Sequence, residues 1–257
     1  MKVSVVKIGG NIIDNVEALD TFIQQFAQLE GLKVLVHGGG KSASALMKQM
    51  GLEPQMINGR RITDAETLKV VTMMYGGLIN KNIVAGLQAQ HCNALGLTGA
   101  DANIIEAHKR PVKEIDFGFV GDVDKVNIAP LKAFFEAGLV PVFCALTHDN
   151  QGQLLNTNAD TIASQIAVGL SEAYEVSLKY CFEKTGVLMD INDESSLIAH
   201  IHQGNYSGLK ADGVIADGMI PKLDNAFDAI GEGVAEVQIG KAENLLQKEF
   251  IGTSITA

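Results

Sequence analysis

The sequence predicts an α/β protein, a three-layer αβα sandwich whose mainly parallel central sheet carries helices on both faces. Short runs of β-branched residues alternate with amphipathic helical stretches along the chain, and repeated strand and helix units favour such a sheet. The chain has 257 residues, 47% of them hydrophobic, which allows a substantial core. Because we find no repeat and no Pro/Ser-rich linker, we expect two lobes on one continuous sheet, residues 1–172 and 173–257.

The expected strands are short apolar runs, and the expected helices are the longer amphipathic stretches between them. The strands are expected at residues 3–8, 33–37, 93–97, 139–146, 174–178 and 235–239. The helices are expected at residues 16–29, 65–90, 129–139, 160–170 and 217–230. Residues 98–126 have the short runs and turn residues of a hairpin, which would form a wall over one end of the sheet.

Composition argues against several classes of partner. The chain has 20 basic and 30 acidic residues, a net charge of -10, so we expect no nucleic acid and no membrane surface as partner. No apolar run reaches the roughly 18 residues of a membrane span, and no secretory signal precedes the first strand. We therefore expect a cytoplasmic protein, in which Cys92, Cys144 and Cys181 are buried reduced thiols.

Two glycine loops follow the first two expected strands, where ligands bind on open α/β sheets. The first strand ends in KIGGN, with Lys7, Gly9 and Gly10, and the second in HGGGK, with Gly39 and Gly40. Glycines there let the backbone approach an anion, and a lysine in an apolar strand needs a negative partner. The loops therefore predict an anion site. The alternative is that the glycines only allow the backbone of a tight strand-to-helix turn, which is a common use of glycine.

Neither loop matches a known nucleotide motif. The GKS after Gly39 lacks the first glycine of a Walker A loop, because Leu35 stands at that position. The window from Gly38 only partly matches the G-x-G-x-x-G of dinucleotide-binding proteins and lacks an acidic residue at a strand end about 20 positions on.

Three further segments carry polar side chains at expected helix starts. Asn156, Asn158 and Asp160 alternate in NTNAD, which exceeds the needs of one helix cap, and Asp160 would accept hydrogen bonds from lysines. Arg61, in NGRRIT, suits a bidentate contact with a carboxylate. Lys222 lies in the first turn of the helix that Asp217 and Gly218 open. A positive charge is unfavourable there because of the helix dipole, unless an anion is bound nearby.

We expect no metal site made by the protein. His200 and His202 stand two apart in an expected helical pattern, so their side chains should point in different directions.

Together these motifs resemble the amino acid kinase family, and within it the members that phosphorylate N-acylglutamates. The resemblance covers nearly the whole chain and is carried by VKIGGN, VHGGGK, NGRRIT, GQLLNTNAD and IADGMIPKLDNA, in the family's order and at compatible spacing. It implies an amino acid kinase fold in which the N-terminal lobe binds the acylglutamate and forms the dimer, while the C-terminal lobe binds ATP.

The resemblance also implies a reaction: ATP, with Mg²⁺, phosphorylates the γ-carboxylate of N-acetyl-L-glutamate in arginine biosynthesis. It assigns catalysis to Lys7, Lys222 and Asp160, with both lysines neutralising charge and Asp160 holding them. The implied substrate-binding residues are Gly39, Gly40, Arg61, Asn156 and Asn158. The implied phosphate- and nucleotide-binding residues are Gly9, Gly10, Lys179 and Gly218.

Two departures from the family's pattern leave alternatives open. Residues 178–186 lack the usual strand-ending aspartate, so Lys179, Glu183 and Lys184 are expected to replace it beside the nucleotide. The wall at 98–126 differs enough that N-succinyl-L-glutamate is the alternative substrate.

The chain begins at the first strand, without the extra helix of arginine-inhibited hexamers, so we expect a homodimer with residues 65–90 at its interface. A catalytically silent amino-acid-binding module is the other alternative, but it would not need both lysines and the aspartate.

Overall fold

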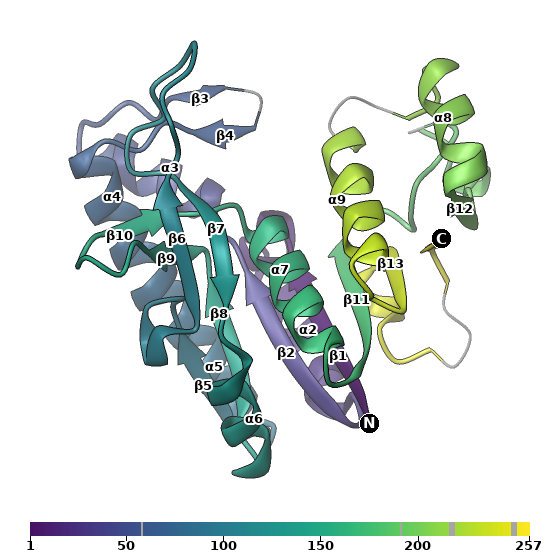
Figure 1. The fold of residues 1–257 in the computed structure, drawn as a ribbon, viewed down its shortest axis with the longest axis horizontal. Coiled ribbons are helices and arrows are strands. Elements are labelled where there is room, and N and C mark those ends of the chain that lie inside the picture. Colours follow the sequence, from purple (N-terminus) through teal and green to yellow (C-terminus); the bar gives the residue numbers. More distant parts are fainter. Residues whose placement is uncertain (58, 191, 216–218, 248–250) are drawn as a thin grey trace.

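The computed structural model in Figure 1 describes residues 1–57, 59–190, 192–215, 219–247 and 251–257. Within these ranges eight strands form the central sheet. In spatial order they are β12 (His200–His202), β14 (Thr253–Thr256), β13 (Glu236–Lys241), β11 (Glu175–Phe182), β1 (Lys2–Ile8), β2 (Leu32–His37), β8 (Val140–Cys144) and β5 (Ala94–Leu97). The strands from β13 to β5 are parallel, whereas β14 is antiparallel to β13. This mainly parallel sheet confirms the predicted fold class.

Helices cover both faces of the sheet, which makes three layers. One face packs against α6 (Ile128–Glu136), α7 (Ala159–Ser171) and α9 (Ile220–Gly231), with α8 (Gln203–Ala211) beside β12 (Figure 1). The other face packs against α1 (Gly10–Ile13), α2 (Val16–Gln28), α3 (Gly40–Gln49), α4 (Ala65–Val71), η1 (Thr72–Ile79) and α5 (Asn80–Ala89). Single 3₁₀ turns are η2 (Asp101–Asn103), η3 (Glu194–Ser196) and η4 (Ala242–Asn244).

The alternation of side chains along β1 explains how one strand serves both layers. Val3 and Val5 belong to the core under α7, while Val6 and Ile8 belong to the core under α2. Both sets are fully or almost fully buried, as expected of a central parallel strand. Lys7 falls on the Val5 side by the same alternation, which turns it toward α7.

A second sheet packs against α7, on the face of the central sheet that α6 and α9 also cover. Its strands are β10 (Leu154–Asn156), β9 (Leu146–His148), β6 (Ile105–Lys109) and β7 (Gly121–Val126), in that order. The antiparallel pair β6 and β7 confirms the hairpin expected within residues 98–126. A separate small hairpin joins β3 (Met56–Ile57) to β4 (Arg60–Arg61).

Some elements differ from the sequence predictions. The run at 139–146 is two strands, because the chain leaves the central sheet after Cys144 and enters the second sheet at Leu146. The helix expected at 65–90 has the wider π-helical hydrogen bonding from Thr72 to Ile79, between two α-helical parts. The division into lobes at 172 and 173 stays a prediction, since β11 pairs directly with β1 across it.

The expectation for the two histidines was wrong. His200 and His202 lie on the strand β12, so side chains two apart share one side, and both are exposed. Among the described residues, no group of three or more His, Cys, Asp or Glu is placed to hold a metal ion. None of the helices in the described ranges is both long and apolar enough to cross a membrane.

Candidate active site

Three charged side chains from three elements meet at the carboxyl end of β1. Lys7 comes from β1, Asp160 from the first turn of α7 and Lys222 from the first turn of α9. The Nζ atom of Lys7 lies 2.6 Å from Oδ1 of Asp160, and the Nζ atom of Lys222 lies 2.6 Å from Oδ2. The structure therefore brings together the three residues that the resemblance assigns to catalysis, and each oxygen of Asp160 serves one lysine.

The charges of this cluster depend on one another. Burial alone would raise the pKa of Asp160, but the charges and hydrogen bonds of Lys7 and Lys222 outweigh it and lower the pKa to about 2. Burial lowers the pKa of Lys222, and the attraction of Asp160 opposes that effect. With both lysines protonated and Asp160 ionised, the cluster carries one net positive charge and favours an anion.

An aromatic ring lies against both lysines. The Nζ atoms of Lys7 and Lys222 lie 5.5 Å and 4.7 Å from the centroid of the Phe182 ring. Phe182 is the last residue of β11, which pairs with β1 in parallel register. Contacts with a ring face stabilise ammonium groups and restrict their positions.

The two glycine loops border the same region. Gly9 and Gly10 join β1 to α1, and Gly40 is the first residue of α3. The residue before α3 is Gly39, and no side chain caps this helix, so its first backbone amides are available to a ligand.

Gly39 has no room for a side chain. Its φ is 150°, and a Cβ atom there would lie 2.3 Å from Cδ1 of Ile79 and 3.1 Å from Cδ1 of Tyr75. We expect Gly39→Ala to lower the free energy of unfolding by about 1–3 kcal/mol, because it overpacks this contact. Urea unfolding measures the effect, with Gly77→Ala as control, since a Cβ atom at Gly77 meets nothing within 4 Å. An equal effect at both positions would contradict the steric explanation.

A cavity of about 160 Å³ lies between the Gly39 loop and the second sheet, and Arg61, Asn156 and Asn158 line it. Nη2 of Arg61 donates to the Gly40 carbonyl at 2.7 Å, and the amide of Asn156 donates to Thr63 Oγ1 at 2.9 Å. These contacts place a cation and an amide at the cavity wall, where both can bind a carboxylate.

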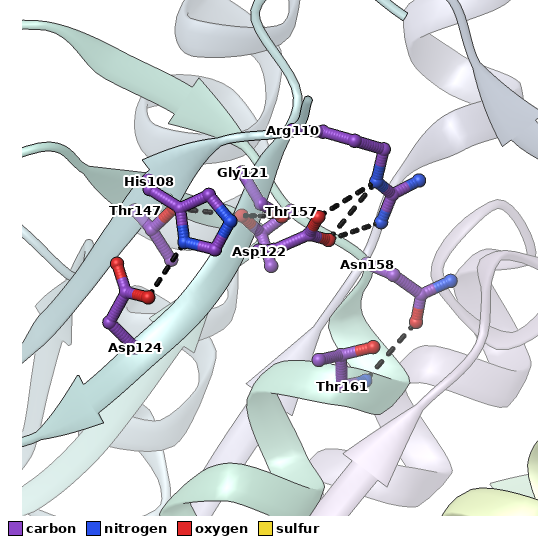
Figure 2. Close-up of polar contacts among 9 residues, drawn as sticks. All are labelled: His108, Arg110, Gly121, Asp122, Asp124, Thr147, Thr157, Asn158 and Thr161. Atoms are coloured by element: carbon purple, nitrogen blue, oxygen red, sulfur yellow. Dashed lines mark hydrogen bonds and ion pairs between the residues drawn. The ribbon is translucent and has the colours of Figure 1, made fainter. Parts of the chain in front are cut away.

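Asn158 acts mainly through the helix that follows it. Its side-chain oxygen accepts hydrogen bonds from the backbone N–H groups of Asp160 at 2.7 Å and Thr161 at 3.2 Å, the second of which Figure 2 shows. Asn158 therefore caps α7 and positions Asp160 at its start.

Three hollows adjoin one another in a row. The cavity beside Asn156 shares Gly40 and Arg61 with a hollow of about 670 Å³ that Lys7 and Lys222 line. That hollow shares Phe182 and Lys222 with a third, of about 590 Å³, whose walls include the apolar residues Val187, Leu188, Met219 and Ile239. The lysines therefore lie between a small polar cavity and a larger, more apolar one.

The structure does not bring Lys179 to this region. Lys179 lies inside β11 rather than after it, and alternation puts it on the face opposite to Tyr180, which pairs with Lys7. Its ammonium group donates to Oε1 of Gln238 on β13. Gly218, expected beside the phosphates, lies outside the described residues.

Sequence reasoning missed Phe182, Tyr75 and Arg110, which also line these hollows. Each depends on a tertiary contact, and no local motif marks it.

His37, which ends β2, is buried, and its Nδ1 and Nε2 atoms lie 2.8 Å from the Gly38 carbonyl and 3.1 Å from Nδ2 of Asn80. Burial lowers the pKa of His37 to about 4, so it is neutral and holds the loop in place.

Comparisons with known proteins give a consistent family. A model of the amino acid kinase family matches residues 2–241. The chain is 56% identical to an acetylglutamate kinase of Cytophaga hutchinsonii, covering 100% of this chain and 99% of that one. It is 57% identical to an acetylglutamate kinase of Bacteroides thetaiotaomicron, covering 99% and 98%. The crystal structure of smu.665 from Streptococcus mutans UA159 has a TM-score of 0.81 and 28% identity, covering 99% and 98%. The chain therefore belongs to the amino acid kinase family.

Proposed function

We propose that this chain transfers the γ-phosphoryl group of ATP to the γ-carboxylate of N-acetyl-L-glutamate, giving N-acetylglutamyl 5-phosphate in arginine biosynthesis. The observation that carries the proposal is the cluster of Lys7, Asp160 and Lys222 between a small polar cavity and a larger apolar hollow. The acetylglutamate kinases that are 56% and 57% identical to the chain support this substrate.

The chemistry needs charge neutralisation more than proton transfer. A glutamate side chain titrates near ~4.3, so the acceptor is already a nucleophile at neutral pH. One carboxylate oxygen forms a bond to the γ-phosphorus while the bond to the β-phosphate oxygen breaks, and ADP leaves. Two anions must approach each other, and Lys7 and Lys222 would offset their repulsion while Asp160 holds both lysines in position.

The cavities support a proposed place for each part of the two substrates. The acylglutamate would occupy the cavity of about 160 Å³, with its α-carboxylate on Arg61 and Asn156. The phosphates would lie in the hollow that Gly9 and Gly10 line, and the adenosine in the apolar hollow beyond Phe182. The amides after Gly39 would bind the reacting groups.

Other parts of the proposal concern the setting of the reaction. Mg²⁺ would arrive on the phosphate oxygens of ATP, because it keeps most of its water and takes few protein ligands. Both oxygens of Asp160 already contact lysines, so this carboxylate is not proposed as a ligand of Mg²⁺.

We also propose a cytoplasmic homodimer with residues 65–90 at its interface, where Met73 and Leu78 are 50% and 54% exposed. Light scattering of the purified chain measures its oligomeric state.

A hydroxylamine trap tests the function. Hydroxylamine converts an acyl phosphate to a hydroxamate, so we expect hydroxamate to accumulate with ATP and N-acetylglutamate, and none without ATP. Glutamate without an acyl group is the control for recognition of the acyl end. Absence of product with N-acylglutamates would favour a silent binding module, and binding of N-acetylglutamate by calorimetry would then identify it.

A further inference from the structure

The middle hollow, of about 670 Å³, contains cations that the proposed function does not use. Its charged lining residues in the described part of the chain are Lys7, Lys41, Lys48, Arg61, Lys222 and Glu183. In the proposed function Lys7 and Lys222 act on the transferred group, and Arg61 binds the α-carboxylate. Lys41 and Lys48, both on α3, are left without a role.

The reaction needs more positive charge than the catalytic cluster supplies. The phosphates of ATP stay negative even with Mg²⁺ bound, and the acceptor carboxylate brings a further negative charge. The cluster of Lys7, Asp160 and Lys222 carries one net positive charge, so it offsets only part of this total. Glu183 adds negative charge to the same hollow. Another cation beside the phosphates would therefore reduce the remaining repulsion.

Lys41 lies on the wall of the hollow that faces away from Lys222. It is the second residue of α3, which follows β2, whereas α9 carries Lys222 and packs on β13 and β14 (Figure 1). Because β1 lies between β2 and β11 in the sheet, the two lysines approach its carboxyl end from opposite sides. A Cβ atom at Gly10 would lie 4.0 Å from Cγ of Lys41, so the Lys41 side chain passes beside the glycine loop proposed for the phosphates.

The ammonium group of Lys41 has a polar partner but no counter-charge among the described residues. Its Nζ donates to Oδ1 of Asn11, and the amide nitrogen of Asn11 donates in turn to Oε1 of Glu183. Asn11 is neutral, and Lys41 forms no ion pair within the part of the chain that the structure describes. A phosphate oxygen can replace the amide oxygen, because hydrogen bonds between two charged groups are stronger.

The positions of the two lysines in α3 distinguish them. Lys48 lies in the last turn, where the helix dipole favours a cation. Lys41 lies in the first turn, where the dipole opposes a cation, and this turn has neither an acidic residue nor a side-chain cap. An anion at this end of α3 would offset that cost, so Lys41 is the lysine whose position favours a ligand.

Lys41 is also the lysine of GKS, the motif that a Walker A loop does not explain. The serine of the motif is engaged within the protein, since Oγ of Ser42 donates to Oδ1 of Asp14. The motif therefore offers its lysine and the first amides of α3 to an anion.

We propose that Lys41 is a third phosphate-binding lysine, which exchanges Asn11 for the β- and γ-phosphates of bound ATP. The inference rests on the proposed function and adds no chemical step to it. These two phosphates are favoured over the α-phosphate, because Lys41 lines the hollow of Lys7 and Lys222 and is not among the described lining residues of the hollow proposed for adenosine. Lys41 is exposed and paired with a neutral group, so it acts on the binding of ATP more than on the transfer step.

Calorimetry with ATP and with AMP, both in the presence of Mg²⁺, tests the proposal. Lys41→Met removes the charge and keeps an unbranched chain, and should raise the Kd of ATP by about 10-fold, the lower end for a hydrogen bond to a charged group because the site is open to solvent. The Kd of AMP, which lacks the β- and γ-phosphates, should not change. In the hydroxylamine assay the KM for ATP should rise, while kcat should fall much less than in Lys222→Ala.

Two further variants separate a direct contact from a general effect of charge. Lys41→Arg keeps the charge and should bind ATP more tightly than Lys41→Met does. Lys69→Met is the matched control, because Lys69 lies on α4, 67% exposed and 2.7 Å from Glu66, and should leave the Kd of ATP unchanged. Added KCl should weaken ATP binding more steeply in the unchanged protein than in Lys41→Met, since the variant has one charge contact fewer to screen.

Several results would overturn the role of Lys41. They are an unchanged Kd of ATP in Lys41→Met, an equal loss of ATP and AMP binding, the same salt dependence in both proteins, and an equal effect of Lys69→Met. If the unchanged protein itself binds no ATP, the proposed function fails, and the role of Lys41 fails with it.

Discussion

Replacing Lys222 by alanine is expected to lower kcat by about 100- to 1000-fold, because removing one group that offsets transition-state charge has this effect in other enzymes. The KM for the acylglutamate should change much less, since Lys222 acts on charge that develops during transfer. The side chain lines two of the hollows, so its removal enlarges them and leaves no sealed gap in the core. Steady-state kinetics with varied acylglutamate at saturating ATP measures both constants.

Lys2→Ala is the matched control for this variant. Lys2 is a lysine of β1 whose side chain is 81% exposed and pairs with Glu175 at 3.0 Å, away from the site. Exposed pairs contribute little to stability, so its kinetic constants should match those of the unchanged protein. A Lys222→Ala enzyme with near-normal kcat would refute the proposed role, and so would a rise in KM without a fall in kcat.

Asp160→Asn should cost both stability and activity. The change keeps the shape of the side chain but leaves Lys7, which is 6% exposed, without its counter-charge. Removing one partner of a buried ion pair typically costs about 3–5 kcal/mol, and we expect a loss of that order at neutral pH. Activity should also fall sharply, because the two ammonium groups would repel each other without the carboxylate between them.

The pH dependence of this loss gives a sharper test. The pKa of Asp160 is lowered from 3.8 to about 2, so its stabilising effect is present above pH 4 and is lost as pH falls toward 2. The difference in unfolding free energy between Asp160→Asn and the unchanged protein should therefore be full at pH 7 and shrink across that acidic range. Urea unfolding at several pH values measures it, with Asp124→Asn as control, because Asp124 is 45% exposed. A constant difference down to pH 2 would contradict the ion-pair explanation.

The parts of the site that the sequence predicts are those with a local physical reason. A lysine inside an apolar strand needs a partner, which is why Lys7 stands out, and glycines between a strand and a helix leave amides exposed. Asp160 is recognisable because NTNAD has more polar side chains than a cap requires. That Lys222 reaches Asp160 from 62 residues away rests on the family resemblance and on the packing of α9 beside α7, since local sequence does not encode it.

The error at Lys179 has a clear cause. The strand was expected to end at residue 178, which would have put Lys179 in a loop at the sheet edge. β11 continues to Phe182, because residues 179–182 pair with both β1 and β13. Lys179 therefore lies within the sheet, and Phe182 takes the place at its edge. Strand ends depend on the neighbouring strands, which a short window of sequence does not contain.

Because a single carboxylate holds both lysines within the folded chain, two long and otherwise mobile side chains are ordered when the protein folds. Immobilising such a side chain costs about 0.5–1.5 kcal/mol when it happens on binding. Here that loss of conformational entropy has already occurred, so the free energy of nucleotide binding need not supply it. The arriving phosphates meet donors that are preorganised, and calorimetry would find a smaller entropic penalty than for lysines that are ordered only by the ligand.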